Sequence, residues 1–146
     1  MTFFPIGQNN ELNIKFKDIP ECIEILKIFV DHYKKVGFEK PWIAYFISLD
    51  GEKIIGGGGF KGPPKNGKVE ISYGTFKNFE GQGIGTQICK HLVDLSLKTD
   101  PAIKITAHTL PDNHPSIAIL KKNGFMQKGE VFDEDDGLVL DWHFEG

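Results

Sequence analysis

Hydrophobic and polar residues recur along the chain with two periods, and these periods predict alternating strands and helices. Residues 11–17 alternate between apolar and polar, which predicts a first strand. Apolar residues between positions 19 and 36 recur at helical spacing, which predicts an amphipathic helix. Asp18 is the predicted N-cap of this helix, and Gly37 is its predicted end.

The middle of the chain predicts three consecutive strands. They cover residues 42–49, 53–61 and 68–76, and Asp50-Gly51 predicts a hairpin turn between the first two. Gly56 to Gly59 lie inside the second of these strands. Four glycines are weak strand formers, so we expect either a bulge or a close approach of another backbone there.

The second half of the chain predicts two helices and three strands. One helix begins near Gly83, and a shorter one begins at an Asn113 cap and ends at Asn123-Gly124. The strands cover residues 103–108, 125–132 and 138–144. The order β-α-β-β-β-α-β-α-β-β predicts one α/β (α+β) domain over residues 1–146, built on a single mixed sheet.

Composition and charge narrow the function classes. The 146 residues are 40% hydrophobic and 25% charged, which is ordinary for a globular protein, and the net charge of −3 argues against a nucleic-acid-binding surface. All 17 basic residues are lysines, so no arginine can clamp a phosphate with two hydrogen bonds. Any phosphate site must therefore use backbone amides, a helix N-terminus and lysine.

Cysteine and histidine usage predicts neither a disulfide framework nor a metal site. Cys22 and Cys89 fall in apolar helical patterns, as small core residues do. No cysteine or histidine spacing is typical of zinc ligands, so we expect no metal. No leader peptide or membrane span is visible, and we expect a cytoplasmic protein that binds no membrane.

The strongest chemical signal is a glycine-rich junction between a strand and a helix. Residues 76–86 read FKNFEGQGIGT, in which Gly81, Gly83 and Gly85 alternate. Glycines leave their N–H groups unobstructed, and a helix N-terminus adds partial positive charge. This arrangement favours binding of a diphosphate, although a ligand-free turn has the same pattern.

Two nucleotide-binding motifs do not fit this junction. A dinucleotide fingerprint needs G-x-G-x-x-G after the first strand of a parallel unit, whereas the sixth position here is Thr86. The chain also lacks the P-loop run G-x-x-x-x-G-K-[ST]. Nicotinamide oxidoreductases are therefore disfavoured.

The chain resembles the GNAT superfamily of N-acetyltransferases, which carries Q/R-x-x-G-x-G/A at the start of the helix after its fourth strand. The matching residues are Glu80 to Gly85, with Glu80 in place of the usual Gln or Arg. Residues 108–125, from His108 to Gly-Phe, are similar to the second motif of the family, and residues 69–74 to its central strand. The likeness covers roughly residues 11–144 and points to the branch of ribosomal-protein alanine acetyltransferases.

The resemblance implies a single, mostly antiparallel sheet flanked by helices, with acetyl-CoA as cosubstrate. In the family, the fourth and fifth strands splay apart, and the pantetheine arm of the cosubstrate lies between them. The diphosphate is expected on backbone amides, and Glu80 is expected to point away from it. The implied cosubstrate contacts are Tyr73, Thr75, Phe76, Gly81, Gln82, Gly83, Ile84, Gly85, Thr86, Asn113, Ser116 and Leu120, with Lys77 and Lys121 as outer phosphate contacts.

The resemblance also implies catalytic residues. Glu70 is the expected general base, since family members use a glutamate at the matching strand position. Many members donate a proton to the thiolate from a tyrosine, but the matching residue here is Leu120. Ser116, Tyr73, His108 or water are the alternatives, and the sequence does not choose among them.

The expected function is transfer of acetyl from acetyl-CoA to a primary amine by direct attack in a ternary complex. The acceptor stays open, whether a protein N-terminus or a small amine, and so does the oligomeric state, a homodimer included. In the family, the end of the molecule that carries the acidic turn at 133–136 can border the acceptor site, where the turn would attract a cationic amine, but the pattern itself favours a solvated hairpin turn. The alternatives are a non-catalytic acyl-CoA sensor on the same fold, and a binding domain in which the glycine loop is only a turn.

Overall fold

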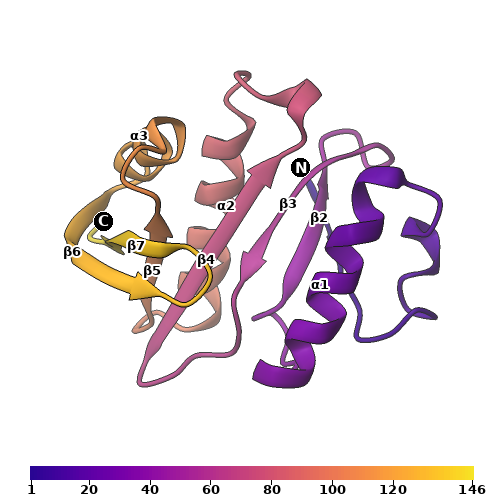
Figure 1. Cartoon of the computed structure of the whole chain (residues 1–146), viewed down its shortest axis with the longest axis horizontal. Helices are drawn as coiled ribbons and strands as arrows, with labels where there is room; N and C mark the ends of the chain where they lie inside the picture. Colours follow the sequence, from indigo (N-terminus) through magenta and orange to yellow (C-terminus); the bar gives the residue numbers. More distant parts are fainter.

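The computed structural model describes every residue from 1 to 146 and contains one seven-stranded sheet with three α-helices (Figure 1). The strand order is β1-β2-β3-β4-β5-β7-β6, and every neighbouring pair is antiparallel except β4 and β5. This arrangement confirms the predicted fold class. The strands are β1 (Thr2–Pro5), β2 (Ala44–Ser48), β3 (Ile54–Phe60), β4 (Lys68–Thr75), β5 (Lys104–Thr109), β6 (Phe125–Asp133) and β7 (Gly137–Phe144), and the helices are α1 (Pro20–Val36), α2 (Ile84–Thr99) and α3 (His114–Lys122).

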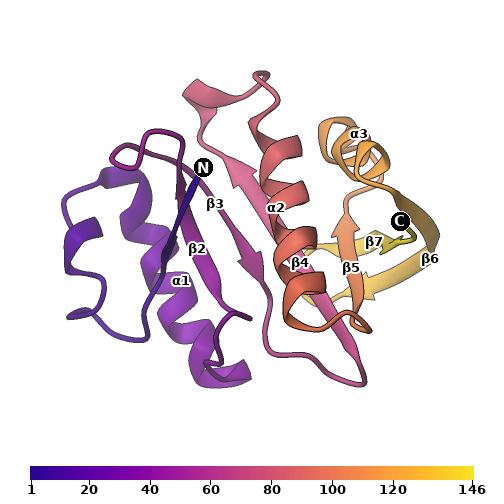
Figure 2. The ribbon, with the colours of Figure 1, turned by 180° about the vertical axis from the view of Figure 1, so that it is seen from behind.

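Helices cover both faces of the sheet. Helix α1 lies over β2 and β3 on the face seen in Figure 1, and α2 crosses the opposite face, which is in front in Figure 2. Apolar residues of α2 fill the space against the sheet, and Ile88 and Leu92 are wholly buried. On the other side, Phe16 packs edge to face against Phe46 with ring centroids 4.7 Å apart. The sheet is thus held rigidly between two apolar layers.

Strands β4 and β5 separate towards their C-terminal ends. They pair only from Lys68–Lys104 to Glu70–Thr106. Beyond these pairs β4 keeps β3 as its partner on one edge, up to Thr75, and β5 keeps β7. One edge of β4 is therefore left without a strand partner from Ile71 onward, as the resemblance implied.

The first strand is the one element that the hydrophobic pattern placed wrongly. Residues 11–17 form a loop with a short 3₁₀ turn, and the edge strand is β1 instead. Leu12 and Ile14 are about 60% exposed, while Asn13 between them is buried. The Asn13 side chain accepts a hydrogen bond from the Gly7 N–H and donates one to the Gly7 carbonyl, which folds the loop back on itself.

The observed helix ends agree with the predicted ones, except at the start of α1. Ile19, not Asp18, is the N-cap of α1, with no capping side chain and with Pro20 as the first helical residue. Gly37 ends α1 as predicted. Asn113 caps α3 as predicted, since its Oδ1 accepts the Ser116 N–H at 3.3 Å. The close backbone approach expected at the glycine run is also present, since a Cβ at Gly59 would lie 2.7 Å from the Ala44 Cα.

The remaining expectations concern cysteines, metals and membranes. Both cysteines are buried, and burial raises the pKa of Cys22 to about 11 and that of Cys89 to about 12. None of the helices is long and apolar enough to cross a membrane. The structure groups no three His, Cys, Asp or Glu side chains in a way that could hold a metal ion.

Candidate active site

The glycine-rich junction presents a row of free backbone donors. Gly81 and Gly83 both have φ of +76°, a left-handed conformation that favours glycine, and Gly83 is the N-cap of α2. No side chain caps the N-terminus of this helix. The carbonyl of the N-cap residue, Gly83, accepts a hydrogen bond from the Gln87 N–H. The amides from Gly81 to Thr86 donate to no protein acceptor, so they are available to an anion at the positive end of the helix.

These amides face a cavity of about 710 Å³, which lies between β4, the start of α2 and α3. Its size suits a cofactor-sized ligand. Nine of the twelve residues expected to contact the cosubstrate line it. The lining consists of Tyr73, Gly74, Thr75, Phe79, Glu80, Gly81, Gly83, Ile84, Gly85, Thr86, Asn113, Pro115, Ser116, Ala118, Ile119 and Lys122.

The free edge of β4 forms one wall of this cavity. The Lys61 N–H donates to the Glu70 carbonyl, and the Phe76 N–H donates to the Ile55 carbonyl, so the even-numbered residues of β4 bond to β3. Backbone groups alternate between the two edges of a strand. Tyr73 and Thr75 therefore direct their backbone groups to the unpaired edge, where an extended ligand could take the place of a strand.

Three further residues of the junction differ in their relation to this cavity. Phe76 is not part of the lining, and its amide is bonded to β3. Gln82 is exposed and is not part of the lining. Glu80 belongs to the lining and is exposed to solvent. A carboxylate close to the free amides would oppose the binding of a diphosphate.

Helix α3 forms the opposite wall, and it turns different residues to the cavity from those expected. Leu120 is wholly buried in the core, whereas Ile119 lines the cavity. The helical period likewise turns Lys122, and not Lys121, towards the site. Lys77 is not part of the lining either. Lys122 is therefore the lysine that the structure offers to a phosphate.

A contact that the sequence did not reveal fixes the spacing between α2 and α3. The Asn123 Nδ2 donates to the Thr86 carbonyl at 3.2 Å and to the Ile119 carbonyl at 3.0 Å. A Cβ at Gly85 would lie 2.8 Å from the Ile119 Cδ1, so a larger residue there would require the end of the Ile119 side chain to shift. The third glycine of the loop thus serves helix packing as well as ligand access.

Tyr73 joins the free strand edge to α3. Its phenol lies beside the Ser116 hydroxyl and the Cys89 thiol. Burial raises the pKa of Tyr73 above its ordinary value, and the hydrogen-bonding influence of Ser116 offsets only part of that rise. The phenol therefore keeps its proton at neutral pH and can donate it inside the cavity.

A second cavity, of about 490 Å³, lies on the α1 side of the sheet. It shares Tyr73, Gly74 and Thr75 with the first cavity. The two cavities therefore share one wall, the end of β4. The second is lined by Ile6, Ile25, Ile28, Phe29, His32, Ala44, Tyr45, Gly57, Gly58, Gly59, Phe60, Lys61, Ser72, Tyr73, Gly74, Thr75, Phe76 and Asp135.

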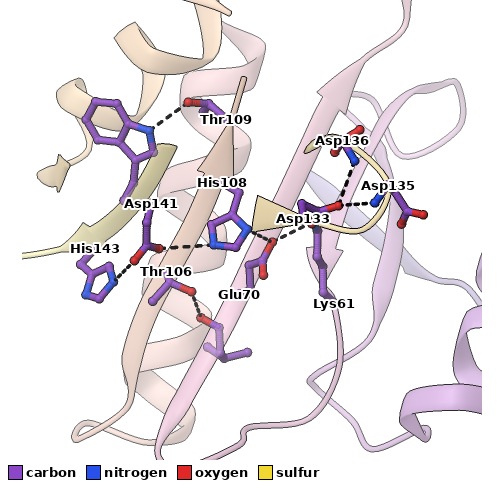
Figure 3. A network of polar contacts seen from close by, with 12 residues as sticks. Lys61, Glu70, Thr106, His108, Thr109, Asp133, Asp135, Asp136, Asp141 and His143 are labelled. Carbon is purple, nitrogen blue, oxygen red and sulfur yellow. Dashed lines mark hydrogen bonds and ion pairs between the residues drawn. The ribbon is translucent and has the colours of Figure 1, made fainter. Parts of the chain in front are cut away.

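Glu70 and His108 belong to a chain of polar contacts rather than to either cavity (Figure 3). Glu70 Oε2 lies 2.7 Å from the Lys61 Nζ and 3.5 Å from the His108 Nδ1. The chain continues from the His108 Nε2 to Asp141, at 3.3 Å, and from Asp141 to His143, at 2.9 Å. Lys61 is the member of this chain that lines the second cavity.

The acidic turn between β6 and β7 reaches the second cavity through one residue, Asp135. Asp133 accepts the N–H groups of Asp135 and Asp136, at 2.8 and 3.0 Å. These two donors hold the pKa of Asp133 below its ordinary value. Asp133 therefore shapes the turn, while Asp135 faces the site.

Comparison with known proteins also indicates similarity to N-acetyltransferases. The chain is 34% identical over 112 residues to the uncharacterized N-acetyltransferase YjdG of Bacillus subtilis (strain 168), which is 76% of this chain and 63% of that protein. The chain thus matches less than two thirds of that relative's length.

Solved acetyltransferase structures share the fold. A chimera of the spermidine N-acetyltransferase SpeG from Vibrio cholerae with hSSAT superposes with a TM-score of 0.71 at 15% identity, over 99% of this chain and 95% of that one. The aminoglycoside acetyltransferase AAC(6')-Ib in complex with coenzyme A gives 0.59 at 24% identity, over 69% and 64%. The acetyltransferase (GNAT) domain family matches residues 7–126, and the chain belongs to that family.

Proposed function

We propose that this chain transfers the acetyl group of acetyl-CoA to a primary amine by direct attack in a ternary complex. The observation that carries the proposal is the row of unbonded amides from Gly81 to Thr86, which faces a cavity continuous with the free edge of β4. The family and the coenzyme A complex of a fold neighbour support acetyl-CoA as the cosubstrate. Acceptors named for the neighbours, an aminoglycoside and spermidine, are amines as well.

The cosubstrate is held mainly by backbone. The amides of Gly81, Gly83 and Gly85, at the N-terminus of α2, bind the diphosphate, and Lys122 adds a positive charge. Tyr73 and Thr75 hydrogen-bond the pantetheine amides as a neighbouring strand would. This placement brings the thioester to the end of β4, where the two cavities meet.

The reaction requires a neutral amine, a stabilised oxyanion and a protonated leaving group. The amine nitrogen attacks the thioester carbonyl, the C–S bond breaks, and one proton moves from nitrogen while another reaches sulfur. Backbone N–H groups near the end of β4 stabilise the oxyanion. The Tyr73 phenol, beside Ser116, donates the proton to the thiolate.

Glu70 is proposed as the acceptor of the amine proton, by way of water beside Lys61. Its importance depends on the amine. An α-amine with a pKa of about 8 is roughly a tenth neutral at pH 7, whereas an alkyl amine with a pKa of about 10.4 is almost wholly protonated. The base therefore matters more for an alkyl amine.

The test is an acetyl-CoA turnover screen against a mixed panel of amines, with free thiol as the readout. We expect thiol release that requires acetyl-CoA, protein and amine together. Both cysteines are buried, so the protein adds little background. Tight acetyl-CoA binding without thiol release from any amine would instead favour the sensor alternative, which the leucine at position 120 leaves open.

A further inference from the structure

We infer that the acceptor is a primary monoamine carried on an apolar body. This inference rests on the proposed acetyl transfer and concerns the cavity on the α1 side of the sheet. Its apolar side chains come from Ile25, Ile28 and Phe29 on α1 and from Ile6 just after β1. Such a lining favours an aliphatic or aromatic group over a hydrated one.

The geometry fixes which end of the acceptor meets this lining. The second cavity borders the first, where the thioester is proposed to lie, along the shared wall formed by Tyr73, Gly74 and Thr75. A Cβ at Gly74 would have no atom within 4 Å, so no side chain covers the strand at this point. With its amine at Gly74, the remainder of the acceptor extends under α1, over Gly57 to Gly59.

The charges around this cavity suit one ammonium group and no more. Asp135 is the single carboxylate among the lining residues. The two basic residues of the lining have other partners and leave Asp135 available to an ammonium group. Lys61 is paired with Glu70 at 2.7 Å, and the His32 Nε2 contacts the Lys61 carbonyl at 2.6 Å. The neighbouring Asp133 and Asp136 are absent from the lining.

Binding in this cavity would therefore be less favourable for a polycation than for a monoamine. The second and third ammonium groups of the polycation would lie against Ile25, Ile28 and Phe29 without a carboxylate partner. Removing an ammonium group from water without such a partner is strongly unfavourable. A monoamine instead meets Asp135 at the entrance, loses its proton, and leaves only apolar groups to be buried.

The test compares acceptors of different charge on the full chain. We expect kcat/KM for 2-phenylethylamine to exceed that for spermidine by about tenfold or more. The unpaired ammonium groups of spermidine would be unfavourable in the transition state as well as in the bound complex. A peptide with N-terminal phenylalanine carries the same chemistry, and its rate relative to 2-phenylethylamine distinguishes a protein source from a small one. A preference for spermidine would overturn the inference.

A charge introduced at Ile28 tests the same idea from the protein side. Ile28 lines the cavity yet is 63% exposed, so Ile28→Glu should fold normally. It should move the ratio of the two amines towards spermidine by about fivefold or more. Ile23→Glu is the matched control, since Ile23 is 47% exposed on the same helix and does not line the cavity. An unchanged ratio in Ile28→Glu, or an equal change in both variants, would contradict the inference.

The outcomes separate this inference from the proposed function. Thiol release with some amine supports acetyl transfer whichever acceptor is preferred. Absence of thiol release with every amine, despite acetyl-CoA binding, would overturn the proposed function and this inference with it. Asp135→Asn should raise KM for 2-phenylethylamine while leaving the Kd of acetyl-CoA unchanged, and Asp136→Asn, in the same turn, should change neither.

Discussion

The two cavities that share the end of β4 are built from different parts of the chain. The first cavity, which we propose holds acyl-CoA and call the acyl-CoA cavity, uses backbone groups, namely the amides of one glycine-rich turn and the free edge of one strand. The second cavity, which we propose holds the acceptor and call the acceptor cavity, uses residues from α1, the sheet and the β6–β7 turn, which are far apart in the sequence. The backbone site is thus fixed by a local motif, whereas the side-chain site depends on the whole tertiary structure.

This difference predicts how the two cavities respond to substitution. A backbone cradle requires its glycines but no arginine, and this chain contains no arginine. A side-chain cavity can change its charge and shape without disturbing that cradle. We therefore expect variants of the first cavity to alter the Kd of acetyl-CoA, and variants of the second to alter the acceptor.

The largest effect is expected where the cavities meet, in Tyr73→Phe. Turnover should fall by about 100-fold, the range of general-acid catalysis, with little change in the Kd of acetyl-CoA. Because burial raises the pKa of Tyr73, turnover should show no decline from loss of this proton below about pH 10. Tyr45→Phe is the matched control, since the Tyr45 hydroxyl donates to the Pro41 carbonyl and Tyr45 does not line the first cavity, so this variant should keep most activity. Turnover of Tyr73→Phe equal to the parent would remove Tyr73 from the mechanism.

The next effect is expected in the glycine cradle. Gly83→Val forces a β-branched residue into left-handed backbone and should raise the Kd of acetyl-CoA by about tenfold or more. Gly67→Val is a matched control, since Gly67 has φ of +74° and open space around it, away from both cavities. Calorimetric titration should separate the two variants. Equal losses of affinity would mean that strain alone, and not the cradle, explains the result.

A smaller effect is expected from Glu70→Gln, which removes the charge that pairs with Lys61 beside the acceptor cavity. Turnover should fall several-fold, more for an alkyl amine than for an α-amine, while acetyl-CoA affinity stays the same. Steady-state kinetics with both amine types measures the difference. Glu130→Gln on β6 is the control, and kinetics of Glu70→Gln equal to the parent would exclude Glu70 as the base.

The smallest effect is expected from Glu80→Gln, and it should be an increase in the affinity for acetyl-CoA. Removing a carboxylate from the lining of the acyl-CoA cavity should tighten acetyl-CoA binding by about threefold at low salt, and by less as salt screens the charge. Glu11→Gln, in the exposed loop before α1, should leave the Kd unchanged. Weaker binding in Glu80→Gln would show that this glutamate assists the site.

Most of the fold could be predicted from the sequence because its elements have clear periods and end signals. The first strand could not, because Leu12 and Ile14 alternate with polar residues by coincidence, while Asn13 makes the contacts that decide the local structure. The edge strand β1 has no alternation of its own and is defined by pairing with β2.

The candidate site divides in the same way. The glycine turn and the Asn113 cap are local signals and could be predicted. The direction in which Leu120 and Lys122 point depends on how α3 packs against α2, which the Asn123 contact with Thr86 fixes. The lining of the acceptor cavity depends on long-range contacts, so its apolar character became visible only in the structure.

The most direct test of the central claim is an NMR titration of amide resonances with coenzyme A. We predict large, saturable shifts for the amides of Gly81, Gly83 and Gly85, and little change for Gly67 in a remote turn of the same backbone conformation. Saturable binding that leaves the three loop glycines unperturbed would contradict the account.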